Sequence, residues 1–239
     1  MNFKIRVAEL NVAISARYAL TAQICRPYLC DESDRRVDLS IYVTGAQIAA
    51  KKRELAIGLT DEQAECICLH EQLSIRIVKF DAFVLHAALI SYRGKGYAIV
   101  APRGGGKTTH ARFWQSAFGD EVRIINGDKP IVRLQKDGSF RAYGTPWCGK
   151  EGLGENASVS LCGICFISKG QKDSARKISE REYVDLLIGN VVFPADQGAM
   201  SRGAKLLARL IRTVPAVAAE GTMTEHAAEA VRNAMLTKE

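Results

Sequence analysis

Alternation of apolar and polar residues predicts strands along the first third of the chain. Residues 2–15, 38–45 and 73–80 each place apolar side chains at every second position, as strands with one buried face do. Residues 46–55 fit either a strand or a short helix, and a helix is expected to begin at residues 61–69, with Asp61 as its cap. The first 80 residues are therefore predicted to form a β-rich part.

After residue 80, short apolar strands alternate with segments of helical spacing. Strands are predicted at residues 83–92, 97–100, 122–125 and 159–168, and a hairpin at residues 131–143. Helices are predicted at residues 108–118, 183–192, 203–214 and 224–236. This alternation indicates an α/β fold with a mixed central sheet and a helical C-terminus. Residues 1–80 and 81–239 are expected to form one compact unit.

Composition and charge narrow the class of protein. The chain has 239 residues, of which 47% are hydrophobic and 25% charged, as in ordinary globular proteins. A net charge of +7 attracts polyanions, but the basic residues are scattered among acids and aromatic residues make up only 7%. Nucleic acid is therefore not an expected partner. No apolar run approaches the roughly 20 residues that cross a bilayer, so no membrane association is expected. Oligomerisation stays open.

Seven cysteines, an odd number, bear on the compartment. The N-terminus lacks the charged-then-apolar pattern of a signal peptide, so the thiols are expected to be reduced and the protein cytoplasmic. Cys66 and Cys68, like Cys162 and Cys165, fall in apolar runs that read as strands, where a thiol packs as a small hydrophobe. Only the second pair has the two-residue gap of zinc ligands, so a zinc site is not expected.

The segment with the clearest chemistry joins the strand at 97–100 to the helix at 108–118. It reads Ala-Pro-Arg-Gly-Gly-Gly-Lys-Thr-Thr and fits the phosphate-loop pattern G-x-x-x-x-G-K-[ST], except that Ala101 replaces the first glycine. Glycines let backbone N–H groups turn toward an anion, and the helix adds its positive N-terminal dipole. ATP would thus be bound by Arg103, Gly104, Gly105, Gly106, Lys107, Thr108 and Thr109. The alternative is an ordinary glycine-rich turn with a chance Gly-Lys-Thr. Within a phosphate loop, Arg103 would either contact phosphate or face solvent.

A metal-facing acid is expected from a second strand. The strand at 122–125 ends in Asn126-Gly127-Asp128, which would lie beside Thr108 if the two strands are neighbours in the sheet. Mg²⁺ takes few protein oxygens and keeps several waters, so Thr108 and Asp128 are the predicted metal ligands. The alternative is a type I′ turn centred on Asn-Gly, with Asp128 in solvent.

Four strings in this order give the chain a family resemblance: residues 86–88, 104–108, 125–130 and 143–151. Together they resemble the HPr kinase/phosphorylase catalytic domain, and more closely the small HPr-kinase-like serine kinases that share a fold with phosphoenolpyruvate carboxykinase. The resemblance covers about two-thirds of the chain. It implies a carboxykinase-like arrangement of the sheet, with Lys107 and Thr108 at the phosphates and metal.

The resemblance also assigns the catalytic positions. The family's two carboxylates after the second strand, one of them the base for the attacked hydroxyl, fall on Gly127 and Asp128, so this chain keeps only the second. His86 matches a histidine beside the phosphate site. From the residues alone, a histidine in an apolar strand is as readily a hydrogen-bonded core residue. Asp128, Lys107 and His86 are accordingly the expected catalytic residues.

The last segment of the candidate site is the glycine-rich stretch at residues 143–151. Trp147 would anchor this loop. Lys150 and Glu151, which follow it, would then cover the nucleotide or receive the acceptor. The alternative is a structural turn with Pro146 and Trp147 packed under the sheet.

The expected function is Mg²⁺-dependent transfer of the γ-phosphate of ATP to a hydroxyl, of serine type, on a protein or peptide. Two alternatives remain: a catalytically weak nucleotide-binding regulatory module, suggested by Gly127, and carboxykinase-type chemistry, for which the chain is short and lacks evident metal ligands upstream of the loop.

Overall fold

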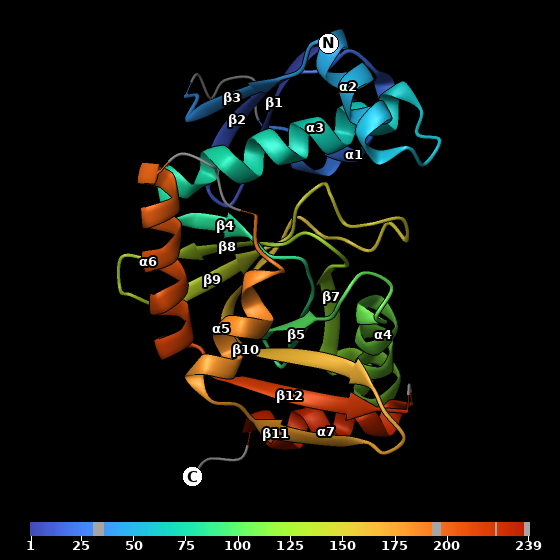
Figure 1. Ribbon diagram of the computed structural model, residues 1–239, viewed down its shortest axis with the longest axis vertical. Coiled ribbons are helices and arrows are strands. Elements are labelled where there is room, and N and C mark those ends of the chain that lie inside the picture. The colour runs from blue at the N-terminus through green and yellow to red at the C-terminus, as the bar shows by residue number, and fades with distance from the viewer. Residues whose placement is uncertain (31–35, 193–196, 223, 237–239) are drawn as a thin grey trace.

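The computed structural model describes residues 1–30, 36–192, 197–222 and 224–236. Within these residues the strands form a sheet of three and a mixed sheet of nine. The smaller sheet and the helices before residue 80 lie above the larger sheet in Figure 1. The fold is thus mixed α/β with a β-rich N-terminal part, as the sequence predicts.

The smaller sheet is built on an N-terminal hairpin. Strands β1 (Asn2–Val7) and β2 (Leu10–Ser15) pair antiparallel, and β3 (Leu39–Tyr42) joins β2 in parallel. These strands confirm the predictions for residues 2–15 and 38–45. The two turn residues, Ala8 and Glu9, have φ values of 50° and 61°, in the left-handed region that the tightest hairpin turns need.

Three helices cover this sheet: α1 (Ala19–Cys25), α2 (Gly45–Leu55) and α3 (Asp61–Arg76). Helices α2 and α3 both begin with a capping box, in which Thr44 pairs with Gln47 and Thr60 with Gln63. Residues 46–55 are therefore helix, and the cap of α3 is Thr60, one residue before the predicted Asp61.

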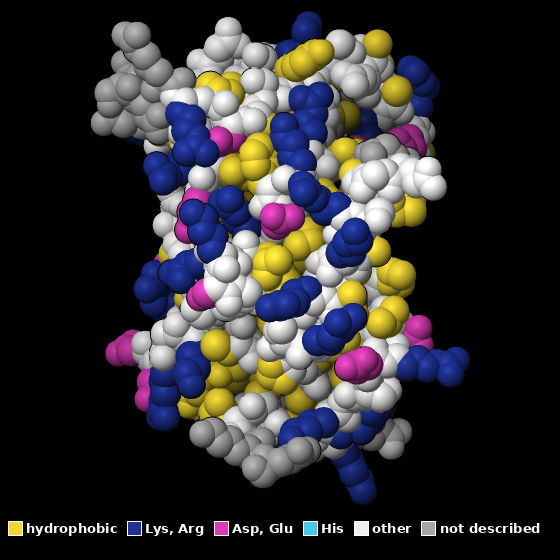
Figure 2. All heavy atoms as spheres, turned by 90° about the vertical axis from the view of Figure 1, so that its left-hand side faces the viewer, with side chains coloured by type: hydrophobic (Ala, Val, Ile, Leu, Met, Phe, Trp, Pro, Cys, Tyr) yellow, Lys and Arg dark blue, Asp and Glu magenta, His cyan; other side chains and the backbone are white. Residues whose placement is uncertain are grey.

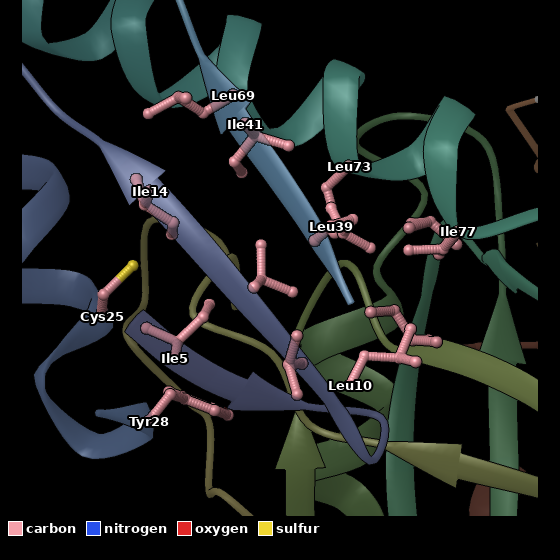
Figure 3. Close-up of a cluster of buried hydrophobic side chains, with 14 of the residues drawn as sticks. Ile5, Leu10, Ile14, Cys25, Tyr28, Leu39, Ile41, Leu69, Leu73 and Ile77 are labelled. Atoms are coloured by element: carbon pink, nitrogen blue, oxygen red, sulfur yellow. The ribbon is translucent and has the colours of Figure 1, made fainter. Parts of the chain in front are cut away.

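The strand predicted at residues 73–80 is wrong. This segment is the last turn of α3 followed by the 3₁₀ helix η2 (Ile77–Phe80). Leu69, Leu73 and Ile77 recur at helical spacing and are fully buried against the small sheet (Figure 3), whereas Ile75 points outward. The apparent alternation therefore came from Ile75, which is 42% exposed and lies off the buried stripe of the helix. Cys66 and Cys68 lie on the same helix, not on a strand.

A buried carboxylate of α3 caps helix α1. Glu65 is fully buried and accepts hydrogen bonds from the backbone N–H of Arg17 (2.6 Å) and Tyr18 (3.2 Å) and from the Thr21 hydroxyl (2.7 Å). Tyr18, the N-cap residue of α1, makes no cap of its own. Glu65, although distant in sequence, thus provides the hydrogen-bond acceptor that a local N-cap side chain provides in other helices.

Glu65→Ala is expected to lower the free energy of unfolding by about 2–4 kcal/mol, because it leaves buried donors without an acceptor. Urea denaturation measures this loss. Glu62→Ala, on the more exposed first turn of the same helix, is the matched control and is expected to change stability by less than about 0.5 kcal/mol. Equal effects of the two substitutions would contradict the remote cap.

The larger sheet holds all the remaining strands that the structure describes. Its continuous path is β4-β8-β9-β10-β6-β5-β7, and β12 pairs with β10 and with β11. The strands are β4 (Ala82–Val84), β5 (Ala87–Tyr92), β6 (Lys95–Val100), β7 (Val122–Asn126), β8 (Ile131–Leu134), β9 (Phe140–Tyr143), β10 (Ser158–Lys169), β11 (Ser174–Lys177) and β12 (Ala216–Gly221). The predicted hairpin at 131–143 is confirmed as β8 and β9, while β11 and β12 were not predicted.

Helices cover both faces of this sheet. Helices α4 (Lys107–Phe118) and α7 (Glu225–Leu236) pack on one face, and α5 (Glu180–Ile188) and α6 (Gln197–Thr213) on the other. Each lies where a helix was predicted, with ends shifted by a few residues. Both faces being covered explains why the central strands β5 and β6 are almost wholly buried.

The two sheets share a core. The apolar cluster of the small sheet (Figure 3) also contains Ala82 and Val84 of β4, Ile131 of β8 and Tyr143 of β9. Polar contacts reinforce it: the Tyr143 hydroxyl donates to Glu9, and Arg133 donates to the carbonyl of Ala8 at 2.7 Å. The edge of the larger sheet is therefore part of the packing of the N-terminal part.

The structure describes all seven cysteines with no disulfide between any two of them, and four of the seven are buried. Among the described residues, no helix combines the length and apolar character needed to cross a membrane.

Candidate functional site

The glycine loop, residues 101–106, follows directly from β6 and leads into α4. Gly104 and Gly106 have φ values of +75° and +89°, where a side chain would be strained. At Gly105 a Cβ would meet the Ala101 Cβ and the Pro102 carbonyl oxygen, each at 2.8 Å. All three glycines are thus required by the backbone, whereas Ala101 keeps the negative φ that a non-glycine residue needs.

Helix α4 begins without a side-chain cap. Its N-cap residue is Gly106, while α2, α3 and α5 are capped by Thr44, Thr60 and Ser179. The first N–H groups of α4 are therefore left for another acceptor, and the helix dipole favours an anion at this point. This is the local geometry that the phosphate-loop pattern predicts.

Lys107 is buried, with 7% of its surface exposed, yet among the described residues its ammonium donates only to the Ala101 carbonyl, at 3.3 Å. Burial lowers the pKa of Lys107, an effect that the nearby Asp128 carboxylate opposes. A buried ammonium bonded to one neutral carbonyl retains donors for an anion.

Strands β6 and β7 are not neighbours in the sheet, although the predicted approach of Asp128 to Thr108 assumed that they would be. Strand β5 lies between them and is antiparallel to both, so β6 and β7 run parallel with their carboxyl ends at one edge. Two strand spacings amount to about 10 Å. The Thr108 hydroxyl still reaches across to the Gly127 carbonyl, at 3.4 Å. The glycine loop and the end of β7 therefore meet despite the intervening strand.

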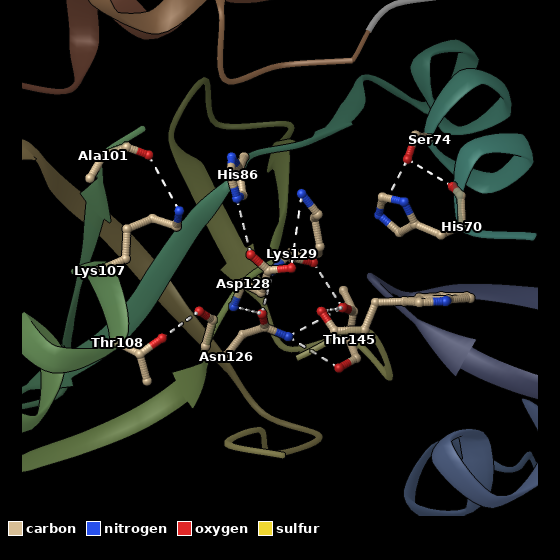
Figure 4. Close-up of polar contacts among 12 residues, drawn as sticks. His70, Ser74, His86, Ala101, Lys107, Thr108, Asn126, Asp128, Lys129 and Thr145 are labelled. Atoms are coloured by element: carbon tan, nitrogen blue, oxygen red, sulfur yellow. Dashed lines mark hydrogen bonds and ion pairs between the residues drawn. The ribbon is translucent and has the colours of Figure 1, made fainter. Parts of the chain in front are cut away.

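The intervening strand also explains the position of His86. Because β5 is antiparallel, its first residues lie at the edge where β6 and β7 end, and His86 immediately precedes it. Figure 4 shows His86 pointing at Asp128, with His86 Nε2 3.1 Å from Asp128 Oδ1. His86 is thus paired with the predicted acid and is not a core histidine.

Asp128 is held by an asparagine that sequence reasoning did not single out. Asn126, fully buried, accepts the backbone N–H groups of Asp128 (2.9 Å) and Lys129 (2.7 Å) through Oδ1. Its Nδ2 donates to the carbonyl and the hydroxyl oxygens of Thr145 (Figure 4). This turn replaces the type I′ alternative, since neither Asn126 nor Gly127 has a positive φ. The signal was present as Asn-x-Asp, the pattern of an Asx turn.

The Asp128 side chain is about one-third exposed and is ionised at neutral pH. Burial alone would raise the pKa of Asp128, but the His86 hydrogen bond and the charges of Lys129 and Lys107 outweigh it, so the pKa is lowered. Only Oδ1 is bonded to His86; Oδ2 lies 3.9 Å from the Lys129 ammonium, beyond hydrogen-bond distance.

A loop from the glycine-rich stretch passes over the end of β7. The Trp147 indole N–H donates to the Cys66 carbonyl of α3 at 3.0 Å, and its ring lies 5.4 Å from that of His70. Trp147 is the predicted anchor, but it packs against the N-terminal part and not under the sheet. Beyond it, the Gly127 N–H donates to the Leu153 carbonyl at 2.8 Å. The loop thereby closes over the backbone of Gly127.

This closure leaves no room for a carboxylate side chain at position 127. A Cβ on Gly127 would lie 2.7 Å from the Cys148 carbonyl oxygen and 3.3 Å from that of Leu153. Gly127→Asp is therefore expected to destabilise the fold by about 1–3 kcal/mol and not to create an acid pair. Gly45→Asp, where a Cβ has open space, serves as the control in thermal unfolding. Full stability of Gly127→Asp would contradict the close contact.

The remaining predicted residues lie further out. Arg103 and Thr109 are exposed on the glycine loop and the first turn of α4. Glu151 forms an ion pair of 2.7 Å with Arg112 of α4, which ties the covering loop to that helix, and Lys150 is exposed beside it. Neither reaches Asp128 in the present geometry.

The described residues of this site offer few side-chain ligands for a magnesium ion. The part of the chain that the structure describes contains no group of three or more His, Cys, Asp or Glu side chains suited to a metal. Mg²⁺ bound with a nucleotide, however, takes most ligands from phosphates and water and needs one or two protein oxygens. Asp128 Oδ2 and the Thr108 hydroxyl meet that smaller requirement.

Comparisons with known proteins give little beyond this geometry. No protein-family model matches the chain, and no curated protein matches it in sequence. Among solved structures, the Hpr(Ser) kinase/phosphatase from Coxiella burnetii is similar with a TM-score of 0.30 and 12% identity, over 54% of this chain and 87% of that one. The function therefore has to be argued from the site itself.

Proposed function

We propose that this protein binds ATP with Mg²⁺ at the edge formed by β6, β5 and β7 and transfers the γ-phosphate to a hydroxyl of a protein or peptide. The observation that carries the proposal is the Thr108–Gly127 contact of 3.4 Å, which joins the uncapped start of α4 to the turn that bears Asp128. Anion-binding amides, an ammonium and one ionised carboxylate thus converge on one point.

Each residue has a role in this proposal. The N–H groups of the glycine loop and Lys107 hold the phosphates, and Thr108 and Asp128 hold the metal ion. Bound Mg²⁺ would neutralise charge on the phosphates. Asp128 accepts the proton of the attacked hydroxyl, and His86 Nε2, 3.1 Å from Asp128 Oδ1, keeps that carboxylate oriented.

A second candidate is a nucleotide-binding module without transfer. The Cys148 carbonyl oxygen favours it, because this atom lies 2.7 Å from where a Cβ on Gly127 would be, which excludes a second acid there and leaves Asp128 to serve both metal and proton.

Two measurements on the unmodified protein separate the candidates. Isothermal titration with ATP and Mg²⁺ tests binding, and γ-labelled ATP with a library of serine-containing peptides tests transfer. Binding of ATP with transfer of phosphate supports the kinase. Binding of ATP with no transfer of phosphate, either to a peptide or to the protein itself, supports the nucleotide-binding module. Absence of binding up to millimolar ATP would overturn both.

A further inference from the structure

Lys129 follows Asp128 and is held more firmly than an ordinary turn residue. Its backbone N–H donates to Asn126 Oδ1 at 2.7 Å, and its carbonyl accepts the Thr145 hydroxyl at 2.8 Å. Pro130 follows at once and fixes the next backbone angle. The Cα of Lys129 is therefore placed by the same buried asparagine that places Asp128.

The Lys129 side chain is held inside the site without a close partner. It is 27% exposed, and its ammonium is 3.9 Å from Asp128 Oδ2, too far for a hydrogen bond. Burial lowers the pKa of Lys129, the Asp128 charge opposes this shift, and the positive charge of Arg103 adds to it. Within the described residues no hydrogen-bond acceptor is recorded for this ammonium, so its three N–H donors are left for a ligand.

The charges around Asp128 do not balance. The buried Lys107 and the half-buried Lys129 place two positive charges on either side of Asp128, with the Lys129 ammonium 3.9 Å from Asp128 Oδ2 (Figure 4). Asp128 is the carboxylate that lies between these two ammonium groups. An anion with several charges would relieve this repulsion, whereas a neutral ligand would not.

The arrangement also orders the cations along the site. In Figure 4, Asp128 lies between Lys107, which curls back on the glycine loop, and Lys129, which lies on the side of His70. Phosphates bound by the loop amides are nearest to Lys107. A phosphate that reaches Lys129 has to extend past the loop to Asp128, which is the position of the last phosphate of a chain.

We propose that Lys129 binds the terminal phosphate of a nucleoside triphosphate and thereby makes the site prefer the triphosphate to the diphosphate. This inference rests on the proposed function. It assigns the two lysines different tasks: Lys107 binds phosphates present in both nucleotides, and Lys129 binds the one that only the triphosphate has.

The test compares ATP and ADP affinities by isothermal titration at fixed Mg²⁺ and salt. Lys129→Met is expected to weaken ATP binding roughly 10- to 100-fold and ADP binding less than about threefold, because a charge-assisted contact is lost only with ATP. Lys129→Arg is expected to retain most of the preference for ATP. Lys136→Met, at the exposed tip of the β8–β9 hairpin, is the matched control and should change neither affinity.

The outcomes separate this inference from the proposed function. If the unmodified protein binds neither nucleotide, both the proposed function and the inference about Lys129 are overturned. If the unmodified protein binds ATP but Lys129→Met, with an unchanged circular dichroism spectrum, loses ATP and ADP affinity equally or loses neither, the inference alone is overturned.

Discussion

Lys107→Met is expected to weaken ATP binding by about 10- to 100-fold and to lower phosphate transfer by about 10²- to 10³-fold. Methionine keeps the buried stem of the side chain but removes the ammonium that now donates to the Ala101 carbonyl. Burial lowers the pKa of this lysine, so its desolvated charge is costly, and replacing it should not weaken the fold.

Lys95→Met is the control for this substitution. Lys95 is exposed at the opposite end of the same strand, β6, and directly follows the turn at Arg93 and Gly94. Titration with ATP and a denaturation curve are measured for both variants. An unchanged ATP affinity in a folded Lys107→Met protein would remove the glycine loop from the nucleotide site.

Asp128→Asn is expected to reduce turnover by about 10²- to 10⁴-fold, the range for loss of a general base, with a smaller effect on nucleotide affinity. Asparagine retains an oxygen that accepts the hydrogen bond from His86, so the side chain keeps its place while its charge is lost. Because the pKa of Asp128 is lowered, the unmodified carboxylate is charged throughout the neutral range, and the comparison reports that charge.

Asp137→Asn controls for the change of side chain at a distance from the site. Asp137 lies at the exposed tip of the β8–β9 hairpin, where it caps the Ser139 N–H. Turnover is measured with labelled ATP and the best acceptor peptide, alongside the KM for ATP. Transfer by Asp128→Asn at the unmodified rate would make Asp128 a turn residue only.

Local sequence predicted the parts of the site that depend on local backbone. The three glycines, Lys107 and Thr108 lie between a strand and a helix as expected, because positive φ at Gly104 and Gly106 is a property of those residues. The start of α3 was predicted to within one residue because polar capping residues mark it locally: Thr60, which forms a capping box with Gln63, directly precedes the predicted Asp61.

Sequence could not supply what depends on strand order. Whether β5 lies between β6 and β7 is decided by pairing among segments far apart in the chain, so the assumption of neighbouring strands was wrong although the predicted contact forms. Likewise, the strand predicted at residues 73–80 failed because burial of Leu73 and Ile77 against the small sheet, a tertiary effect, fixes that segment as helix. The proximity of Trp147 to α3 had no local signal at all.

The core shared by the two sheets has a consequence for synthesis on the ribosome. The N-terminal hairpin turns through Ala8 and Glu9, both at positive φ, and is braced by Arg133 and Tyr143, which are made much later. The Tyr28 hydroxyl likewise donates to the Glu155 carbonyl at 3.0 Å, a hydrogen bond that can form only after residue 155 has been synthesised. At about 5–20 residues per second, translation from residue 80 to residue 156 takes roughly 4–15 seconds. During that interval the apolar side chains of the N-terminal part that pack against β8 and β9 stay exposed, and chaperone binding is expected to concentrate there.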